Sequence, residues 1–206
     1  EPGIIFCNFK DSIDSVRDYL SQQRIQHECF SGGMEQKDRE RALIKFRNGS
    51  SRILVATDLA ARGIDIPELK FIIHYELPHR IEEFTHRNGR TARVNEAGTA
   101  YVLQWDKEPL PEFIKKSKGI NISKTNRLGD PLWETLFISG GRKDKISKGD
   151  IAGLFFKQGG LIKEQLGDIE LKQDCAFVAV PKSKSNKLVN ELNNSRLKKK
   201  KVRITV

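Results

Sequence analysis

The sequence predicts an α/β domain built on a parallel sheet with helices on both faces, followed by a smaller α+β domain. Strand-like and helix-like segments alternate over the first part of the chain. The order changes to β-α-β-β-α-β over roughly the last 75 residues. A polar, irregular stretch at 119–131 separates the two patterns. We therefore expect two domains, 1–125 and 126–206.

The first domain consists of short apolar strands separated by helices that each have an apolar face. Gly49 ends one helical pattern, and Pro78 precedes another. Strands are expected at 3–8, 28–31, 52–57, 71–75 and 99–103, and helices at 12–23, 36–47, 81–88 and 109–118. Ligands of such sheets bind beyond the carboxyl ends of the strands.

The second domain has the order of a ferredoxin-like split unit. Strands are expected at 134–139, 167–172, 175–180 and 200–206, and helices at 148–158 and 184–193. The lysine run 198–201 is its low-complexity patch, and such a run alone is more typical of a solvated face than of a binding site.

The charge is uneven along the chain. Of the formal net charge of +10, the part up to Arg127 carries +3 and the part from Gly129 onward carries +7. The excess suggests a polyanionic partner such as nucleic acid, although a solvated basic face remains the alternative.

Several classes of protein are disfavoured by composition. No run approaches the ~18 apolar residues of a membrane span. The first residues lack the pattern of a signal peptide, and because Ile4-Ile5-Phe6 already looks like a buried strand, we expect them to be the start of a fragment. Cys7, Cys29 and Cys175 have no metal-ligand spacing, so we expect no metal site in the chain. An odd number of cysteines fits a reducing cytoplasm, with the thiols as small buried groups.

The densest chemical signal is the segment 54–65, Leu-Val-Ala-Thr-Asp-Leu-Ala-Ala-Arg-Gly-Ile-Asp. A buried strand ends at Thr57, whose hydroxyl and amide can bind a phosphate. Gly63 permits a turn closed to other residues. Asp65 can accept hydrogen bonds from a sugar hydroxyl. The alternative is a plain strand-to-helix turn.

A second signal is the segment 86–93, His-Arg-Asn-Gly-Arg-Thr-Ala-Arg. At helical spacing, Arg90 and Arg93 lie on one face, where two guanidinium groups can clamp one phosphoryl group. They would neutralise charge on a transferring phosphate. A basic helix end paired with Glu82 and Glu83 is the alternative. A weaker third signal is the pair Gly32 and Gly33 before a helix that carries Gln36-Lys37-Asp38-Arg39.

Together these segments resemble the C-terminal lobe of the DEAD-box RNA helicases, a RecA-like fold. Residues 5–8 look like motif IV, 36–39 like the Gln-x-x-Arg motif, 57–65 like motif V and 86–93 like motif VI. Asn88 stands where the family usually has Ile, and Ala92 where many members have Gly.

The resemblance implies a role for each matching residue. Arg90 and Arg93 would contact the γ-phosphate of ATP, Asp65 would hold the ribose, and Gly63 would also belong to the nucleotide-binding residues. Gly33, Arg39 and Thr57 would touch the RNA backbone, and His86 and Arg87 would couple the ATP and RNA sites.

The sequence has no Gly-x-x-x-x-Gly-Lys-Ser/Thr loop and no Asp-Glu-Ala-Asp. In this family the β-phosphate and Mg²⁺ are held mainly by a first RecA-like lobe, which would be a partner of this one. We expect the chain alone neither to hydrolyse ATP nor to unwind RNA.

The second domain resembles an RRM with a degenerate aromatic platform. Phe137 would face outward if Leu136 and Ile138 face the core, and Cys175 stands where an aromatic residue is usual. Phe137 and Phe177 are either functional or core residues. A helicase lobe followed by such a domain resembles the DbpA-type DEAD-box proteins, which bind a hairpin of large-subunit ribosomal RNA and act in ribosome assembly.

Basic residues in expected loops are candidates for RNA contact: Arg142, Lys143, Lys145, Lys163, Lys182 and Lys184. We therefore predict an ATP-dependent RNA helicase that is monomeric and cytoplasmic and does not associate with a membrane. Two alternatives stay open: a non-catalytic RNA-binding module that has kept a helicase-like lobe, and a helicase of the same superfamily with another target, such as DNA.

Overall fold

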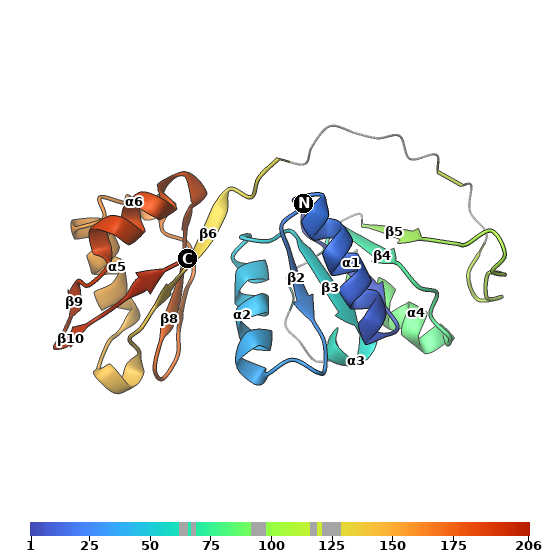
Figure 1. The fold of residues 1–206 in the computed structure, drawn as a ribbon, viewed down its shortest axis with the longest axis horizontal. Helices are drawn as coiled ribbons and strands as arrows, with labels where there is room; N and C mark the ends of the chain where they lie inside the picture. The colour runs from blue at the N-terminus through green and yellow to red at the C-terminus, as the bar shows by residue number, and fades with distance from the viewer. Residues whose placement is uncertain (62–65, 67–68, 92–97, 116–118, 121–128) are drawn as a thin grey trace. The chain divides into compact units, whose positions relative to one another are not determined.

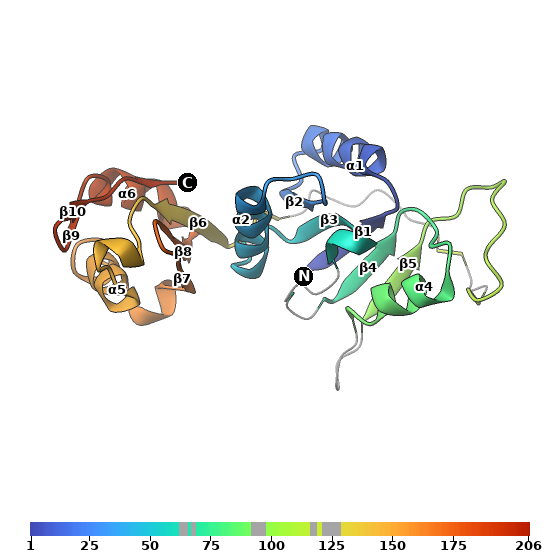
Figure 2. The same cartoon turned by 90° about the horizontal axis from the view of Figure 1, so that it is seen from below.

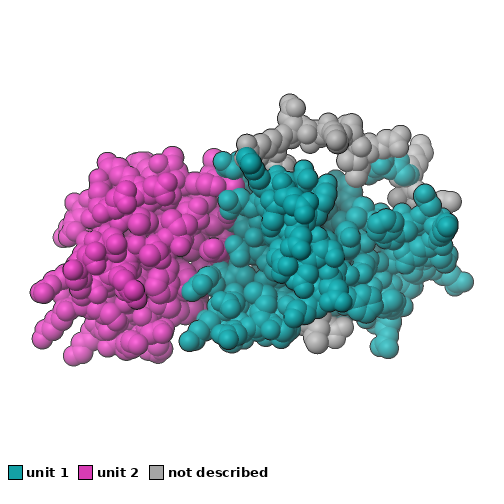
Figure 3. All heavy atoms as spheres, viewed as in Figure 1, with its two compact units in different colours: residues 1–43, 51–130 teal, residues 44–50, 131–206 magenta. Residues whose placement is uncertain are grey.

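The computed structural model describes residues 1–61, 66, 69–91, 98–115, 119–120 and 129–206. Contacts between residues divide the chain into two compact units (Figure 3). Unit 1 is Glu1–Leu43 with Ser51–Asp130, and unit 2 is Ile44–Ser50 with Pro131–Val206. The boundary expected between 125 and 126 lies outside the described residues.

Unit 1 contains a five-stranded sheet in the order β2-β3-β1-β4-β5, and every pairing in it is parallel (Figure 1). The strands are β1 (Gly3–Cys7), β2 (His27–Phe30), β3 (Ile53–Thr57), β4 (Phe71–His74) and β5 (Thr99–Val102). The central strand β1 is buried at all five residues. Burial on both faces explains why it reads as a continuous apolar run rather than an alternating one.

The described residues of unit 1 contain or begin four helices: α1 (Lys10–Gln22), α2 (Gln36–Arg47), α3 (Asp58–Ala61) and α4 (Ile81–Asn88). The apolar face of α1, with Ile13, Val16 and Leu20, packs against Ile5 and Val55 of the sheet. Figure 2 shows α1 on one side of the sheet and α4 on the other. The expected parallel sheet with helices on both faces is therefore confirmed.

The helix expected at 109–118 is wrong for the residues that the structure describes. Residues 109–115 contain no helix and only a turn at 111–114, in which the N–H of Ile114 donates to the carbonyl of Pro111 at 2.9 Å. Pro109 and Pro111 have no N–H to donate, and each disfavours a helical conformation in the residue before it. The apolar spacing was therefore not sufficient to make a helix.

Unit 2 contains a four-stranded antiparallel sheet in the order β11-β6-β8-β7. Its strands are β6 (Trp133–Ile138), β7 (Ile169–Leu171), β8 (Ala176–Pro181) and β11 (Ile204–Thr205), and its helices are α5 (Lys148–Lys157) and α6 (Lys182–Leu192). Two short 3₁₀ turns, η1 (Arg142–Asp144) and η2 (Lys163–Gln165), lie in the connections. This arrangement confirms the ferredoxin-like order.

One face of this sheet carries the core of unit 2. Leu136, Ile138 and Val178 point to that face and pack with Ile151 of α5 and Leu188 of α6, and all five are almost fully buried. Because successive side chains of a strand alternate between faces, the side chains of the intervening residues lie on the opposite face.

The single strand expected at 200–206 is wrong, because the chain forms two short pieces there. Strand β10 (Lys200–Lys201) pairs with β9 (Arg196–Leu197), whereas β11 pairs with β6. The N–H of Val202 still bonds to Ser195, but the carbonyl of Arg203 accepts from Ser139. The backbone thus changes partner between residues 202 and 203.

No helix among the described residues is both long enough and apolar enough to cross a membrane.

Candidate functional site

The carboxyl edge of the parallel sheet gathers polar residues from distant parts of unit 1. Strands β1, β3 and β4 run in the same direction, so the residues that follow them meet at one edge. Asn8 follows β1, Asp58 follows β3, and Glu76 lies just beyond β4. Thr57, predicted to touch RNA, is the last residue of β3 at this edge.

Arg87 of α4 connects all three of these positions. Its Nε donates to both carboxylate oxygens of Asp58, at 2.9 and 3.0 Å. Its Nη1 donates to the carbonyl of Glu76 at 2.9 Å, and its Nη2 donates to Oδ1 of Asn8 at 2.7 Å. The guanidinium also lies over the ring of Phe6, 5.2 Å from the centroid.

The Arg87 side chain is 0% exposed and that of Asp58 is 19% exposed, so this is a buried ion pair. A planar guanidinium with five donors suits the task, because a lysine could not serve several acceptors in one plane. Arg87 therefore links the ends of three strands. We call its contacts with Asn8, Asp58 and Glu76 the Arg87 brace. The coupling role predicted for it stays a prediction, as does that of His86, which is exposed on the same helix.

Arg90 does not lie on a helix. The prediction that Arg90 and Arg93 share one face of a helix is therefore wrong for Arg90, the one of the two that the structure describes. Helix α4 ends at Asn88, and the N–H of Arg90 bonds to the carbonyl of Arg87 in a turn at 3.1 Å. Thr91 then bridges to Leu69, and its hydroxyl donates to the carbonyl of that residue at 2.6 Å. Arg90 is half-buried, and its carbonyl accepts the N–H of Leu69, which precedes β4, at 3.4 Å. Gly63, Asp65 and Arg93 lie outside the described residues.

Asn88, which stands where motif VI usually has Ile, is the partner of a buried histidine, His74. Nε2 of His74, at the end of β4, lies 3.1 Å from Oδ1 of Asn88. Burial lowers the pKa of His74 from 6.5 to about 4, so the ring is neutral and Nε2 carries the proton that Asn88 accepts. The usual Ile at position 88 would leave this N–H without its acceptor.

The residues predicted to contact RNA near α2 lie beyond β2, whose carboxyl end shares this edge of the sheet because β2 pairs in parallel with β3. Gly33 is exposed, and Nζ of Lys10 lies 3.7 Å from the point where a Cβ on Gly33 would sit. The guanidinium of Arg39 packs over the ring of Phe30, 4.9 Å from its centroid. Lys10 was missed in the sequence, since only its position in space brings it beside Gly33.

A cavity of about 480 Å³ lies between α1, β2 and the start of α2, and Lys10 and Gly33 line part of it. Its lining carries both signs of charge, including Asp14 and Arg41.

At the edge of the sheet, the hydroxyl of Thr57 accepts the N–H of Ala60 at 3.4 Å and so helps to begin α3. That contact uses an oxygen lone pair, and the hydroxyl proton remains able to donate.

The structure divides the six predicted cations of unit 2 between two ends of the sheet. Arg142 and Lys143 belong to η1, which follows the carboxyl end of β6, and Lys145 comes directly after η1. Lys182 begins α6, and its N–H bonds to the carbonyl of Leu132, before the first residue of β6. The six therefore do not form one patch.

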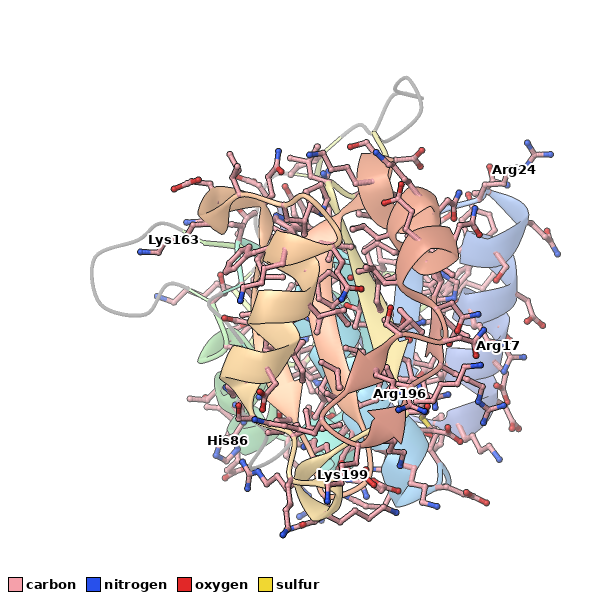
Figure 4. All side chains as sticks on the ribbon, turned by 90° about the vertical axis from the view of Figure 1, so that its left-hand side faces the viewer. Arg17, Arg24, His86, Lys163, Arg196 and Lys199 are labelled. Atoms are coloured by element: carbon pink, nitrogen blue, oxygen red, sulfur yellow. The ribbon has the colours of Figure 1, made fainter. Side chains whose placement is uncertain are left out.

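Lys163 and Lys184 belong to the same end of the sheet as Lys182. Nζ of Lys184 donates to Oε1 of Gln165 at 2.7 Å, which places it beside Lys163 in η2. In Figure 4, Lys163 lies well apart from Lys199, which belongs to the other end of unit 2.

The two aromatic residues of the degenerate platform face each other across β6 and β8. Phe137 and Phe177 are direct cross-strand partners, with ring centroids 5.6 Å apart at 64°. They lie on the face away from the core, as expected for Phe137 from its neighbours Leu136 and Ile138. Phe177 is only 7% exposed, so little of its ring is open to stack on a base.

Burial keeps two of the cysteines as neutral thiols. It raises the pKa of Cys7 to about 12 and that of Cys29 to about 11. No group of three or more His, Cys, Asp or Glu side chains suited to a metal ion occurs in the part of the chain that the structure describes.

Two families match this chain: the helicase conserved C-terminal domain over residues 1–95, and the DbpA RNA binding domain over residues 135–206. The chain is also 32% identical over 217 residues to the ATP-dependent RNA helicase DbpA of Escherichia coli (strain K12). It is the C-terminal lobe of a DEAD-box protein joined to a DbpA-type RNA-binding domain. The DbpA helicase of Bacillus subtilis (strain 168) is 29% identical over 232 residues.

Both alignments cover 98% of this chain but 46% and 48% of the two helicases, so the chain spans about half the length of these relatives. Among solved structures, the yeast DEAD-box splicing factor Prp28 matches with a TM-score of 0.50 and 31% identity, over 52% of this chain and 24% of that one. This DEAD-box lobe is thus related to known proteins by both sequence and fold.

Proposed function

We propose that this chain supplies the second ATP-binding lobe and the RNA-targeting domain of an ATP-dependent RNA helicase, as domains 1–125 and 126–206. The observation that carries the proposal is the Arg87 brace, because it fixes three strand ends and the start of the segment that carries Arg90. A rigid edge is what a group aimed at a developing charge requires.

The predicted site residues bind either the nucleotide or the RNA, or they connect the two sites. ATP held between two lobes supplies the γ-phosphoryl group, and Mg²⁺ is held mainly by the first lobe. Arg90 and Arg93 neutralise charge on the transferring phosphate, Asp65 holds the ribose, and Gly63 also belongs to the nucleotide-binding residues. The RNA backbone is bound in the lobe by Gly33, Arg39 and Thr57. His86 and Arg87 connect the two sites.

The ATPase part is tested with a chimera of the first lobe of the Bacillus subtilis relative joined to this chain. RNA-stimulated ATP hydrolysis should appear in the chimera and not in the chain alone. Arg90→Ala should lower the turnover by roughly 10³-fold or more, since an arginine finger contributes about 10³–10⁵ in related reactions. Arg80→Ala, at the exposed start of α4, is the matched control. Unchanged turnover in Arg90→Ala, or clear turnover from the chain alone, would contradict the proposal.

We further propose that the RNA target is a hairpin of large-subunit ribosomal RNA and that the helicase acts as a cytoplasmic monomer in ribosome assembly. Support comes from the match of residues 135–206 to the DbpA RNA binding domain and from the basic residues of unit 2. The chain is titrated with that hairpin and with a scrambled hairpin over a salt series. A preference that survives raised salt supports a specific target. Equal affinities with equal salt slopes would show that unit 2 is a generic cationic domain.

A further inference from the structure

The buried pair of His74 and Asn88 has no part in the function proposed for the lobe. His74 is the last residue of β4 and is 0% exposed. Its ring lies close to those of Phe6 in β1 and Phe84 in α4, with centroids 6.5 and 5.1 Å away. Its Nδ1 is buried without a hydrogen-bond partner among the described residues, which costs free energy. A phenylalanine would fill the same place without this cost, so packing does not explain why a histidine stands there.

The histidine adds one hydrogen-bond donor to this place. Nε2 of His74 lies 3.1 Å from Oδ1 of Asn88, the last residue of α4. Because the ring is neutral and an amide oxygen can only accept, Nε2–H is the donor. The bond therefore joins the end of β4 to the end of α4.

The end of α4 lacks the left-handed closure that is common where helices stop. Gly89, the residue after the helix, has φ of −66° and ψ of 1°, outside the left-handed region. Its N–H bonds to the carbonyl of Thr85 at 2.8 Å, as it would in a continuing helix. Since helix ends fray, we expect the bond from His74 to fix where α4 stops.

The turn that carries Arg90 begins at Asn88. The carbonyl of Asn88 accepts the N–H of Thr91 at 3.1 Å. The hydroxyl of Thr91 in turn donates to the carbonyl of Leu69 at 2.6 Å. Arg90 thus lies between two attachments to the same strand. Thr91 is bound to Leu69, which precedes β4, and Asn88 is bound to His74, which ends it.

We propose that His74 and Asn88 are positioning residues for Arg90. The proposal rests on the proposed function, because it takes from it that Arg90 neutralises charge on the transferring phosphate. A guanidinium does so best when its backbone already holds it in the right direction as the charge develops. A displacement of ~1 Å can cost about 10²-fold in rate. The His74–Asn88 bond fixes the start of the turn, and it acts on the phosphate only through Arg90.

The kinetic test uses the chimera of this chain with the first lobe of the Bacillus subtilis relative. His74→Phe keeps a ring beside Phe6 and Phe84 but removes the donor. Its kcat should fall by roughly 10-fold, because a loosened turn holds Arg90 in place less often. KM for ATP should stay within about twofold, since the lost interaction is one made in the transition state.

Two further variants separate the bond from the ring. His74→Gln places an amide N–H near the position of Nε2, so it keeps the bond and loses the ring. Its kcat should stay within about threefold of the wild type. His74→Phe with Asn88→Ile should lose no more kcat than either single variant, because the two residues act as one pair. Additive losses, or a loss in His74→Gln in place of His74→Phe, would overturn the positioning.

The control for stability is Val16→Ala, which weakens the packing of α1 on the other side of the sheet from α4 (Figure 2). Its kcat should stay within about twofold where circular dichroism shows every variant folded. Equal falls of kcat in Val16→Ala and His74→Phe would overturn the positioning. So would wild-type kcat in His74→Phe beside a large loss in Arg90→Ala, which leaves the proposed function intact. A wild-type chimera without RNA-stimulated ATP hydrolysis would overturn both.

Hydrogen exchange of the whole chain tests the geometry without a first lobe. The amides of Arg90 and Thr91 bond to the carbonyls of Arg87 and Asn88 and close the turn. NMR should show them exchanging about tenfold faster or more in His74→Phe, and at nearly the wild-type rate in His74→Gln. An equal acceleration at Val55, in the middle of β3, would show a general loss of stability and overturn the local role. Unchanged exchange of Arg90 and Thr91 in His74→Phe would overturn it as well.

Discussion

Arg87→Ala should destabilise unit 1 and leave unit 2 unchanged. The substitution removes a fully buried guanidinium, while Asp58, at 19% exposure, keeps its charge. The carbonyl of Glu76 and Oδ1 of Asn8 lose their donors as well. Breaking a buried ion pair by removing one partner costs about 3–5 kcal/mol. Because Asp58 retains some contact with solvent, we expect the lower value, about 3 kcal/mol.

This loss can be converted into a melting temperature. For a domain of this size, 1 kcal/mol lowers Tm by roughly 3–6 °C, so the Tm of unit 1 should fall by roughly 10–15 °C. Scanning calorimetry measures the shift, and hydrogen exchange read by mass spectrometry assigns it to the peptides of β1, β3 and β4. Arg87→Lys, which keeps the charge but not the planar set of donors, should lose about half as much.

His86→Ala is the control for this prediction, because His86 is the exposed neighbour of Arg87 on the same helix. Its effect should be within about 0.5 kcal/mol. A fall of Tm below about 3 °C in Arg87→Ala, or an equal fall in the exchange protection of unit 2, would refute the reasoning. In that case the ion pair would not be what fixes the edge of the sheet.

Three further predictions follow from single contacts. The pKa of His74 is lowered to about 4 in the folded state, so the neutral ring stabilises the fold fully above pH ~6.5, and this stabilisation is lost as the pH falls toward ~4. Between about pH 7.5 and 4, the free energy of unfolding of the wild type should fall by up to about 3 kcal/mol more than that of His74→Phe. Urea unfolding measures this difference. Asn88→Ile should cost about 1–3 kcal/mol, because it leaves the buried Nε2–H of His74 unbonded; adding His74→Phe should restore most of it, and no restoration would contradict the pairing. Ser147→Ala removes the hydroxyl that accepts the N–H of Asp150 at 3.1 Å and should lower the free energy of unfolding of unit 2 by about 1 kcal/mol, with the exposed Ser183→Ala as a neutral control.

The strands and most helices could be predicted from local pattern, because burial on a sheet or under a helix leaves a regular apolar spacing. The helix at 36–47, for example, has the same bounds in sequence and structure. The failures lie where local pattern and tertiary contact disagree. Residues 109–115 have apolar spacing but two prolines, and residues 200–206 look like one strand but change partner in the middle.

The candidate site was predictable in its residue types and much less so in its geometry. Arg87 reads locally as part of an exposed basic helix end, yet its partners lie 29 and 79 positions away along the chain. His74 was not noticed, because a lone histidine in a strand has no local signature of its partner. The left-handed turn at Lys198 turns a lysine run into a hairpin, which no charge pattern encodes.

The Arg87 brace also has a consequence for kinetics. Its acceptors come from residues 8, 58 and 76, so it closes only after three strands have aligned. Contacts of that kind form late and are largely absent from the transition state of folding. Arg87 variants should therefore refold at nearly the wild-type rate but unfold faster, by roughly two powers of ten for a loss of about 3 kcal/mol. The brace then determines how long the lobe stays folded, and it has little effect on how quickly the lobe folds.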